Sequence, residues 1–173
     1  MAEFGKIDIL VNVAGGSWGE TFRSGPLVEL EPHDFIECYR LNVLTAFMCS
    51  RAVQPIMKGQ GKGAIVNIAS GAGVNPGTGQ AAYGAAKAGV INMTKSMAFE
   101  WAPEIRVNSI ALGGIETPHR PMWAEQVQQS AVSRNALGRL GTPDEHAGTV
   151  LWLVSDAANF ITGETVAADG GRR

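Results

Sequence analysis

A tyrosine and a lysine stand four positions apart in the stretch AAYGAAKAG, at Tyr83 and Lys87. On a helix these positions lie on one face about one turn apart, so the phenol and the ammonium can meet. A cation about 4 Å away at an effective dielectric near 20 contributes about 4 kcal/mol, enough to lower a tyrosine pKa by up to about three units. Such a tyrosine could act as a general acid at neutral pH. Such a pair is common, and taken alone it is more often a core tyrosine beside a solvated lysine.

Two further polar residues make the chemical interpretation stronger. Ser70 follows an apolar run and precedes the loop GAGVNPGTGQ, whose small residues need no hydroxyl for packing. Asn42 lies in the apolar stretch LNVL, where a buried amide must find partners. The sequence therefore indicates a site that combines a phenol, an ammonium, a hydroxyl and an amide from separate segments.

Short apolar runs alternate with helical patterns along the chain. Patterns typical of buried strands cover residues 7–12, 63–69, 105–111 and 165–168. Helical patterns cover residues 32–58, 81–101 and 142–154, and the polar segment 116–139 indicates short mobile helices. We expect Pro55 to kink or fray the first helix and Gly59 to end it.

This alternation predicts an α/β fold, with a doubly wound parallel sheet of about four strands, flanking helices and right-handed crossovers. The 173 residues fit one domain that covers residues 1–173. Ligands of such sheets lie beyond the carboxyl ends of the strands. Gly15, Ser70 and Gly113 each follow a predicted strand, so we expect three loops to converge on one crevice.

Composition excludes several classes of partner. A formal net charge of −2 offers no field for nucleic acid or an anionic membrane. The chain has neither a long apolar run nor a secretion-signal pattern, so we expect a soluble, cytoplasmic protein. Cys38 and Cys49 fall about 16 Å apart in one predicted helix, too far for a disulfide, and are expected to be buried thiols. The histidines show no ligand spacing, so we expect no metal site.

Several motifs occur together in a fixed order. They are NVAG, LNV, IVNIAS, YGAAK, RVNSIALGGIETP, RLGTPDEHAG and a closing DGG. With these motifs the chain resembles the short-chain dehydrogenase/reductase family over nearly its whole length. The resemblance implies a Rossmann-like fold and hydride transfer between NAD or NADP and a small-molecule ketone or secondary alcohol, with the protein supplying orientation and proton transfer.

The resemblance also implies roles for individual residues. Tyr83 would be the general acid/base, while Lys87 would lower its pKa and bind the nicotinamide ribose. Ser70 would hydrogen-bond the substrate oxygen, and Asn42 would hold a water that relays protons from Lys87. The implied cofactor-binding residues are Asn12, Ala14, Gly15, Tyr83, Lys87, Gly113, Ile115 and Thr117.

The chain departs from the family pattern at three points. Val13 and Leu112 stand where an asparagine and a proline are usual, and Leu112 is expected to loosen the cofactor loop. No G-x-G-x-x-G turn precedes Ile7 or occurs elsewhere in the chain. The resemblance then implies only the carboxyl-terminal half of the fold, without the residue that selects NAD or NADP.

Two functions stay open at this point. One is an oxidoreductase with an intact catalytic set, and the other is a catalytically incompetent remnant that acts as an oligomeric or partner-binding module. A third possibility is a fragment of an incomplete gene. The strand at residues 7–12 would have one free edge, which we expect another copy or an amino-terminal segment to cover.

The two long helices resemble the family's dimer interface, so we expect a homo-oligomer. Met93, Met97 and Trp101 suit either the core or that interface. The segment HRPMWAEQVQQSAVSRN matches the family's variable lid, and its apolar residues could line a pocket for a bulky substrate. The candidates for this lining are His119, Met122 and Trp123, with Trp18 from another loop; packing of Trp123 on the lid itself is an equal alternative.

Overall fold

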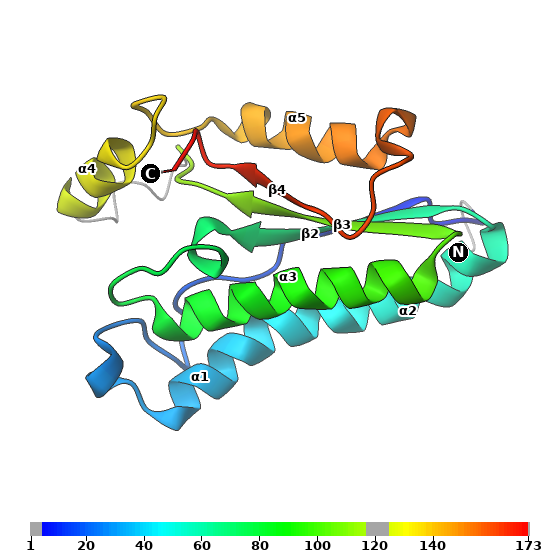
Figure 1. Ribbon diagram of the computed structural model, residues 1–173. Coiled ribbons are helices and arrows are strands. Elements are labelled where there is room, and N and C mark those ends of the chain that lie inside the picture. Colours follow the sequence, from blue (N-terminus) through cyan, green and yellow to red (C-terminus); the bar gives the residue numbers. More distant parts are fainter. Residues whose placement is uncertain (1–4, 117–124, 173) are drawn as a thin grey trace.

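A single parallel sheet forms the centre of the molecule (Figure 1). The computed structural model describes residues 5–116 and 125–172. The strands lie in the order β1-β2-β3-β4, and every neighbouring pair is parallel. Their bounds are Ile9–Asn12, Gly63–Ser70, Ile105–Leu112 and Thr165–Ala168. The predicted α/β class and the four-stranded parallel sheet are confirmed.

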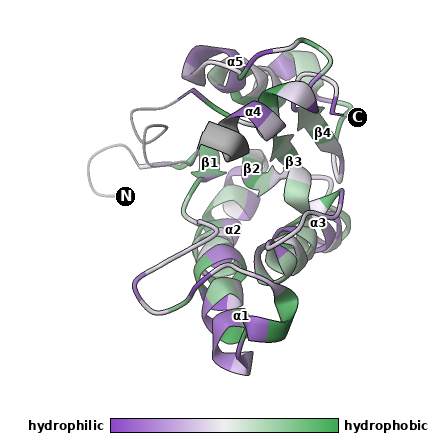
Figure 2. Ribbon diagram, turned by 90° about the vertical axis from the view of Figure 1, so that its left-hand side faces the viewer, coloured by the Kyte–Doolittle hydropathy of each residue, from purple (hydrophilic) through white to green (hydrophobic). Residues whose placement is uncertain are grey.

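Helices cover both faces of this sheet, which makes three layers (Figure 2). One face carries a long helical rod and a second long helix, and the other face carries a single helix. The rod consists of α1 (Pro32–Tyr39), a π-helical turn (Arg40–Leu44) and α2 (Thr45–Gln60). The remaining helices are α3 (Ala81–Trp101) beside the rod, α5 (Pro143–Val154) on the opposite face, and the short α4 (Glu125–Ser133).

The connections between strands do not all have the same hand. The first two pass through α2 and α3 on one face, whereas the third passes through α5 on the other (Figure 2). Because the strands follow one another in a single direction across the sheet, a connection through the opposite face must have the opposite hand. The expectation of right-handed crossovers throughout is therefore wrong. The rule is a strong preference rather than a requirement, and this connection, which spans residues 113–164, is an exception to it.

Most predicted boundaries agree with the structure. The bounds of α3 match residues 81–101, and α5 begins after Thr142, whose side chain caps the helix together with Glu145. The first long helix runs past Pro55 to Gln60 and ends at Gly61, where φ is 73°. A glycine with left-handed backbone is the usual helix stop, and the prediction placed it two residues too early.

Strand β1 is less buried than predicted. Its sequence suggested a strand buried on both faces, yet Ile9 is 47% exposed. β1 lies at the edge of the sheet and pairs only with β2 among the described strands. An edge strand has no neighbour on its outer side to cover its side chains, so apolar composition alone overestimated its burial.

The core lies between the sheet and its helices. Two apolar clusters fill the layer on the α1–α3 side, and a third joins the sheet to α5. Met97 is buried in this core, and Met93 and Trp101 pack against it, so these residues are core rather than surface. Both cysteines are free thiols, but only Cys38 is buried and Cys49 is exposed, contrary to expectation. None of the helices in the described ranges combines the length and apolar content that a membrane crossing requires.

A chain of buried side-chain hydrogen bonds ties β1 to the helices beneath it. The Asn12 amide donates to Ser50 Oγ at 2.9 Å and to Asn67 Oδ1 at 2.7 Å. Asn67 in turn donates to Thr94 Oγ1 at 2.9 Å, and Thr94 donates to the Val90 carbonyl at 2.8 Å. These bonds satisfy polar groups that would otherwise destabilise an apolar layer.

Asn67 is the central member of this chain, so its removal should be costly. We predict that Asn67→Ala lowers the free energy of unfolding by about 2–3 kcal/mol, because it leaves the buried amide of Asn12 short of an acceptor. Urea unfolding measures the change. Asn75→Ala, at an exposed position of the loop after β2, is the matched control. Equal losses for the two variants would contradict this account.

Candidate functional site

Tyr83 and Lys87 lie in the first turns of α3, on the face turned toward the sheet. The Lys87 side chain is only 3% exposed, and its Nζ lies 5.7 Å from the centroid of the Tyr83 ring. Their neighbours in AAYGAAKAG are all alanine or glycine, so this end of the helix can approach the sheet closely. The prediction that the two side chains lie together on one face of the helix is confirmed.

Ser70 faces this pair from the carboxyl end of β2. Its Oγ accepts a hydrogen bond from the Ala72 N–H at 3.2 Å, which fixes the hydroxyl at the start of the loop. The Ser70 hydroxyl lies near enough to the Tyr83 phenol to lower the pKa of that phenol. The hydroxyl groups of Ser70, on β2, and Tyr83, on α3, therefore lie near each other at the edge of the sheet.

Two glycines make this meeting possible, and the sequence analysis gave them no role. A Cβ on Gly73 would lie 2.7 Å from the Lys87 carbonyl carbon and 2.8 Å from the Ala88 nitrogen. A Cβ on Gly84 would lie 2.8 Å from the Ala72 carbonyl oxygen. Backbone atoms cannot give way as a flexible side chain can, so both positions require glycine. A glycine inside a helix, at Gly84, was the available signal of close packing.

Asn42 occupies the π-helical turn between α1 and α2. Its amide donates to the carbonyls of Cys38 and Gly16, both at 2.9 Å, while its Oδ1 accepts the Gly16 N–H at 3.1 Å. A π-turn displaces the local helical hydrogen bonds and is frequent at functional sites. The predicted need of this buried amide for partners is thus met by the loop that follows β1.

Gly15 lies where Asn42 and Lys87 come together. A Cβ on Gly15 would lie 2.5 Å from Asn42 Oδ1 and 3.1 Å from Lys87 Nζ. Lys87 Nζ also donates to the Ile68 carbonyl of β2 at 2.8 Å. The loops after β1 and β2 therefore converge as predicted, on a group of four side chains that we call the quartet: Asn42, Ser70, Tyr83 and Lys87.

Two other predicted cofactor-binding residues, Ala14 and Asn12, belong to the end of β1 and the loop that follows it. Ala14 is exposed beside Gly15, whereas the Asn12 side chain points into the interior, toward Ser50 and Asn67. Any contact of Asn12 with a ligand would therefore have to use its backbone. Ala14 directly precedes Gly15, which lies against Asn42 and Lys87, whereas the Asn12 amide is directed away from these residues.

The loop after β3 lies farther along the edge of the sheet. Gly113 donates its N–H to Ala168 at 3.0 Å and packs on Asp169, at the boundary with β4. Ile115 forms an isolated bridge with Gly141. Leu112 is held in the strand ladder beside Ala168, so it does not loosen the chain at its own position. Thr117 and the lid residues His119, Met122 and Trp123 lie outside the described residues.

Burial dominates the electrostatics of the quartet. Desolvation raises the pKa of Tyr83, the Ser70 hydroxyl lowers it in part, and Cys38 raises it further. Desolvation lowers the pKa of Lys87 to about 8, with Cys38 acting in the opposite direction. The expectation that Lys87 brings the Tyr83 pKa toward 7 is therefore wrong for this structure. The ammonium is directed at the Ile68 carbonyl rather than the phenol oxygen, and the phenolate would lose hydration.

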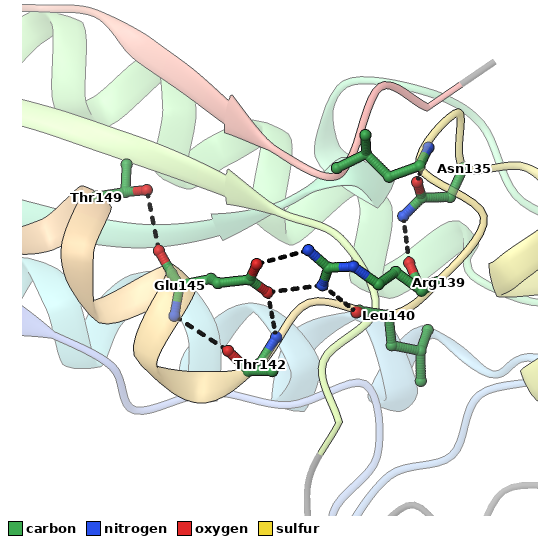
Figure 3. A network of polar contacts seen from close by, with 7 residues as sticks. Asn135, Arg139, Leu140, Thr142, Glu145 and Thr149 are labelled. Atoms are coloured by element: carbon green, nitrogen blue, oxygen red, sulfur yellow. Dashed lines mark hydrogen bonds and ion pairs between the residues drawn. The ribbon is translucent and has the colours of Figure 1, made fainter.

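A polar network on the opposite side of the sheet edge holds the loop of residues 135–142 (Figure 3). Arg139 forms an ion pair with Glu145 through two hydrogen bonds of 2.6 and 2.8 Å. This arginine, together with the Thr142 N–H, lowers the pKa of Glu145 to about 2. Glu145 also accepts the Thr142 N–H at 2.8 Å, and Asn135 donates to the Arg139 carbonyl at 2.8 Å. The start of α5 and this loop thus form one fixed unit.

Two hollows of about 540 and 160 Å³ border this unit. The larger is lined by Glu116, Arg139 and Glu145 among others, and the smaller by Asn135, His146 and Asp169 among others. Neither includes a member of the quartet. The quartet is identified by its chemistry and its converging hydrogen bonds, not by cavity size.

Comparison with known proteins identifies the family. A family profile described as Enoyl-(Acyl carrier protein) reductase matches residues 1–173. The 3-oxoacyl-(acyl-carrier-protein) reductase FabG of Thermotoga maritima is 41% identical over 170 residues, covering 98% of this chain and 67% of its own. The chain belongs to the short-chain dehydrogenase/reductase family. Within this family, 7alpha-hydroxysteroid dehydrogenase of Bacteroides fragilis is 39% identical over 173 residues, covering 99% of this chain and 66% of that protein.

Solved short-chain dehydrogenase/reductase structures share the fold. A 7alpha-hydroxysteroid dehydrogenase in complex with NADH and 7-oxo glycochenodeoxycholic acid has a TM-score of 0.89 and 34% identity, covering 99% of this chain and 66% of that one. A 4-hydroxyisoleucine dehydrogenase in complex with NADH has a TM-score of 0.82 and 36% identity, covering 95% of this chain and 68% of that one. The chain spans about two thirds of the length of these short-chain dehydrogenase/reductases, which are oxidoreductases.

The buried lysine makes stability depend on pH. The pKa of Lys87 is about 8 in the fold against 10.5 for an ordinary lysine, so between these values only the unfolded chain carries the proton. Stability contributed by this residue should therefore rise across that window, by about 3 kcal/mol in total. Below about pH 8 both states are protonated, and burial of the ammonium reduces stability by a constant amount.

We predict that Lys87→Met removes this dependence. Between pH 8 and 10.5, the free energy of unfolding of the wild type should rise relative to that of the variant. Urea unfolding at several pH values measures both. Lys58→Met, at an exposed position of α2, is the control. Parallel pH profiles for the wild type and Lys87→Met would show that the lysine titrates normally.

Proposed function

We propose that the protein interconverts a ketone and a secondary alcohol by hydride transfer with NAD or NADP, and that Tyr83 is the general acid/base. The observation that supports this most is that the hydroxyls of Ser70 and Tyr83 lie near each other, with Lys87 and Asn42 beside them. A carbonyl oxygen placed between the two hydroxyls would accept a hydrogen bond from each. Proton transfer of this kind typically contributes about 10²–10⁴ in rate.

The described residues fit the nicotinamide end of such a cofactor. A side chain on Gly15 would crowd Asn42 Oδ1 and Lys87 Nζ, so glycine at this position keeps both groups close to the loop backbone. A ribose hydroxyl bound next to these two groups would find both an acceptor and a donor. Lys87 and the backbone of Gly15 would hold that end, with Gly113 and Ile115 farther along the rim. When bound, the dinucleotide supplies or accepts the hydride.

The protein's own groups move the proton. In the direction of reduction, Tyr83 gives its phenolic proton to the carbonyl oxygen, and Ser70 donates a hydrogen bond to that oxygen. Because burial raises the pKa of Tyr83, the phenol is protonated at neutral pH and ready to act as the acid. Lys87 and Asn42 would pass a proton back to the phenolate, in the role that their family positions imply.

The pyrophosphate of the dinucleotide is the part for which residues 1–173 offer no binding motif. The chain contains no G-x-G-x-x-G turn, and its matched relatives are longer by about a third of their length. A glycine-rich turn at a helix N-terminus normally binds the phosphates of a dinucleotide. We propose that residues 1–173 hold the nicotinamide end of the dinucleotide and contribute little to the binding of its pyrophosphate.

Calorimetric titration with NAD, NADH, NADP and NADPH tests binding, and ketone reduction tests the chemistry. Tyr83→Phe should reduce the rate of reduction at least 100-fold and leave the Kd for the dinucleotide within about threefold, because it removes the proton donor only. Tyr39→Phe changes the protein's other tyrosine, exposed on α1, and is the matched control. A folded sample that binds none of the four dinucleotides would instead favour the incompetent alternative.

We also propose that the protein self-associates. Large apolar side chains remain exposed along the outer face of the α1–α2 rod, at Ile36, Tyr39, Leu44, Phe47 and Met48. Such a row along one face is typical of an interface. This is the rod that resembles the family's dimer interface.

Light scattering at micromolar concentration should give the mass of a dimer or larger species. Met48→Glu should shift the mass toward the monomer, because it places a charge in the apolar face, whereas Lys58→Glu near the end of the same helix should not. A monomeric wild type would contradict the proposal.

A further inference from the structure

The guanidinium of Arg172 lies beside the catalytic serine's loop. A Cβ on Gly71 would lie 3.0 Å from Arg172 Nη1 and 3.7 Å from its Cδ, so the arginine occupies the space that a side chain at this position would take. Gly71 is buried and directly follows Ser70, with Cα atoms about 3.8 Å apart across one peptide bond. The side chain therefore reaches from beyond β4 back to the end of β2.

The backbone that presents Arg172 is held in place. Asp169 Oδ1 accepts the N–H groups of Gly171 at 3.0 Å and of Arg172 at 3.2 Å. Gly170 and Gly171 have φ of 69° and 76°, values that suit glycine. Their carbonyls accept the N–H groups of Leu137 and Ala136 at 3.1 and 3.0 Å, so the turn is bound to the loop fixed by the Arg139–Glu145 network (Figure 3).

The guanidinium of Arg172 has no hydrogen-bond or ion-pair partner among the side chains that the structure describes. The carboxylate of Asp169 is engaged by two backbone N–H groups. A partly buried guanidinium without an anion is unfavourable, and its planar set of donors suits a carboxylate or phosphate.

We propose that Arg172 binds an anionic oxygen group, a carboxylate or a phosphate, on the substrate whose carbonyl is held by Ser70 and Tyr83. The inference rests on the proposed function and narrows its substrate class to oxo acids or ketone phosphates and the corresponding alcohols. Arg172 is thus a specificity residue. Gly71, which directly follows Ser70, contributes by leaving room for the guanidinium.

Steady-state reduction of matched substrates by the purified protein with saturating NADH or NADPH tests the inference. The carboxylate arm compares 4-oxopentanoate, 5-oxohexanoate and 6-oxoheptanoate with their methyl esters, and the phosphate arm compares dihydroxyacetone phosphate with dihydroxyacetone. At least one charged member should have a kcat/KM 10-fold or more above that of its neutral partner. Arg172→Met should raise its KM 10- to 100-fold and change the neutral partner less than twofold.

Two further variants keep the test decisive. Arg172→Lys retains the charge without the planar donors and should fall between the wild type and Arg172→Met. Arg134→Met removes an exposed arginine of the neighbouring loop and should change neither substrate. If charged and neutral partners react equally well in the wild type, or if Arg172→Met affects both alike, the inference is overturned while the proposed function stands.

Absence of any ketone reduction by the wild type would overturn the proposed function instead. The arginine is then tested by binding alone, with calorimetric titration of 4-oxopentanoate and of inorganic phosphate into the wild type and Arg172→Met. Binding that is lost in Arg172→Met supports an anion site, and equal or absent binding overturns it.

Discussion

The site depends on the close packing of the loop after β2 against the first turns of α3. Gly73 and Gly84 allow two backbones to touch, and this contact sets the distance between the end of β2 and the helix. Ser70 and Tyr83 belong to these two segments, so their hydroxyls meet only because the backbones do. The same approach buries Lys87 and directs its ammonium at the Ile68 carbonyl. Packing, hydrogen bonding and electrostatics at the site therefore share one cause.

Burial has opposite effects on the two titrating partners. It raises the pKa of Tyr83 and lowers that of Lys87, because the loss of water disfavours the charged form of each group. A neutral phenol suits proton donation to a carbonyl, and a lysine with a pKa of about 8 can give up a proton more readily than an ordinary one. The buried thiol of Cys38 acts on both groups, although no role in the site was expected for it.

The β1 edge of the sheet has fewer stabilising contacts than the region around β2 and β3. Around β2 and β3, helices cover both faces and the loops are fixed by glycines, ion pairs and caps. At β1, the buried Asn12–Asn67–Thr94 chain binds the strand to the helices below, but the outer edge pairs with no described strand. Ser70, Tyr83 and Lys87 of the quartet belong to β2 and α3, in the part of the molecule around β2 and β3. The geometry of the quartet is complete even though the chain covers about two thirds of its relatives' length.

The sequence by itself determined the order and type of the elements, the shared helix face of Tyr83 and Lys87, and the family motifs, because these are properties of local spacing. Only the tertiary structure decided the direction of the Tyr83 pKa shift, the inward Asn12 side chain, the exposure of β1 and the hand of the last crossover. It alone placed Arg172 beside Gly71. Desolvation and contact depend on distances between segments far apart in the chain, and those distances are fixed when the layers pack.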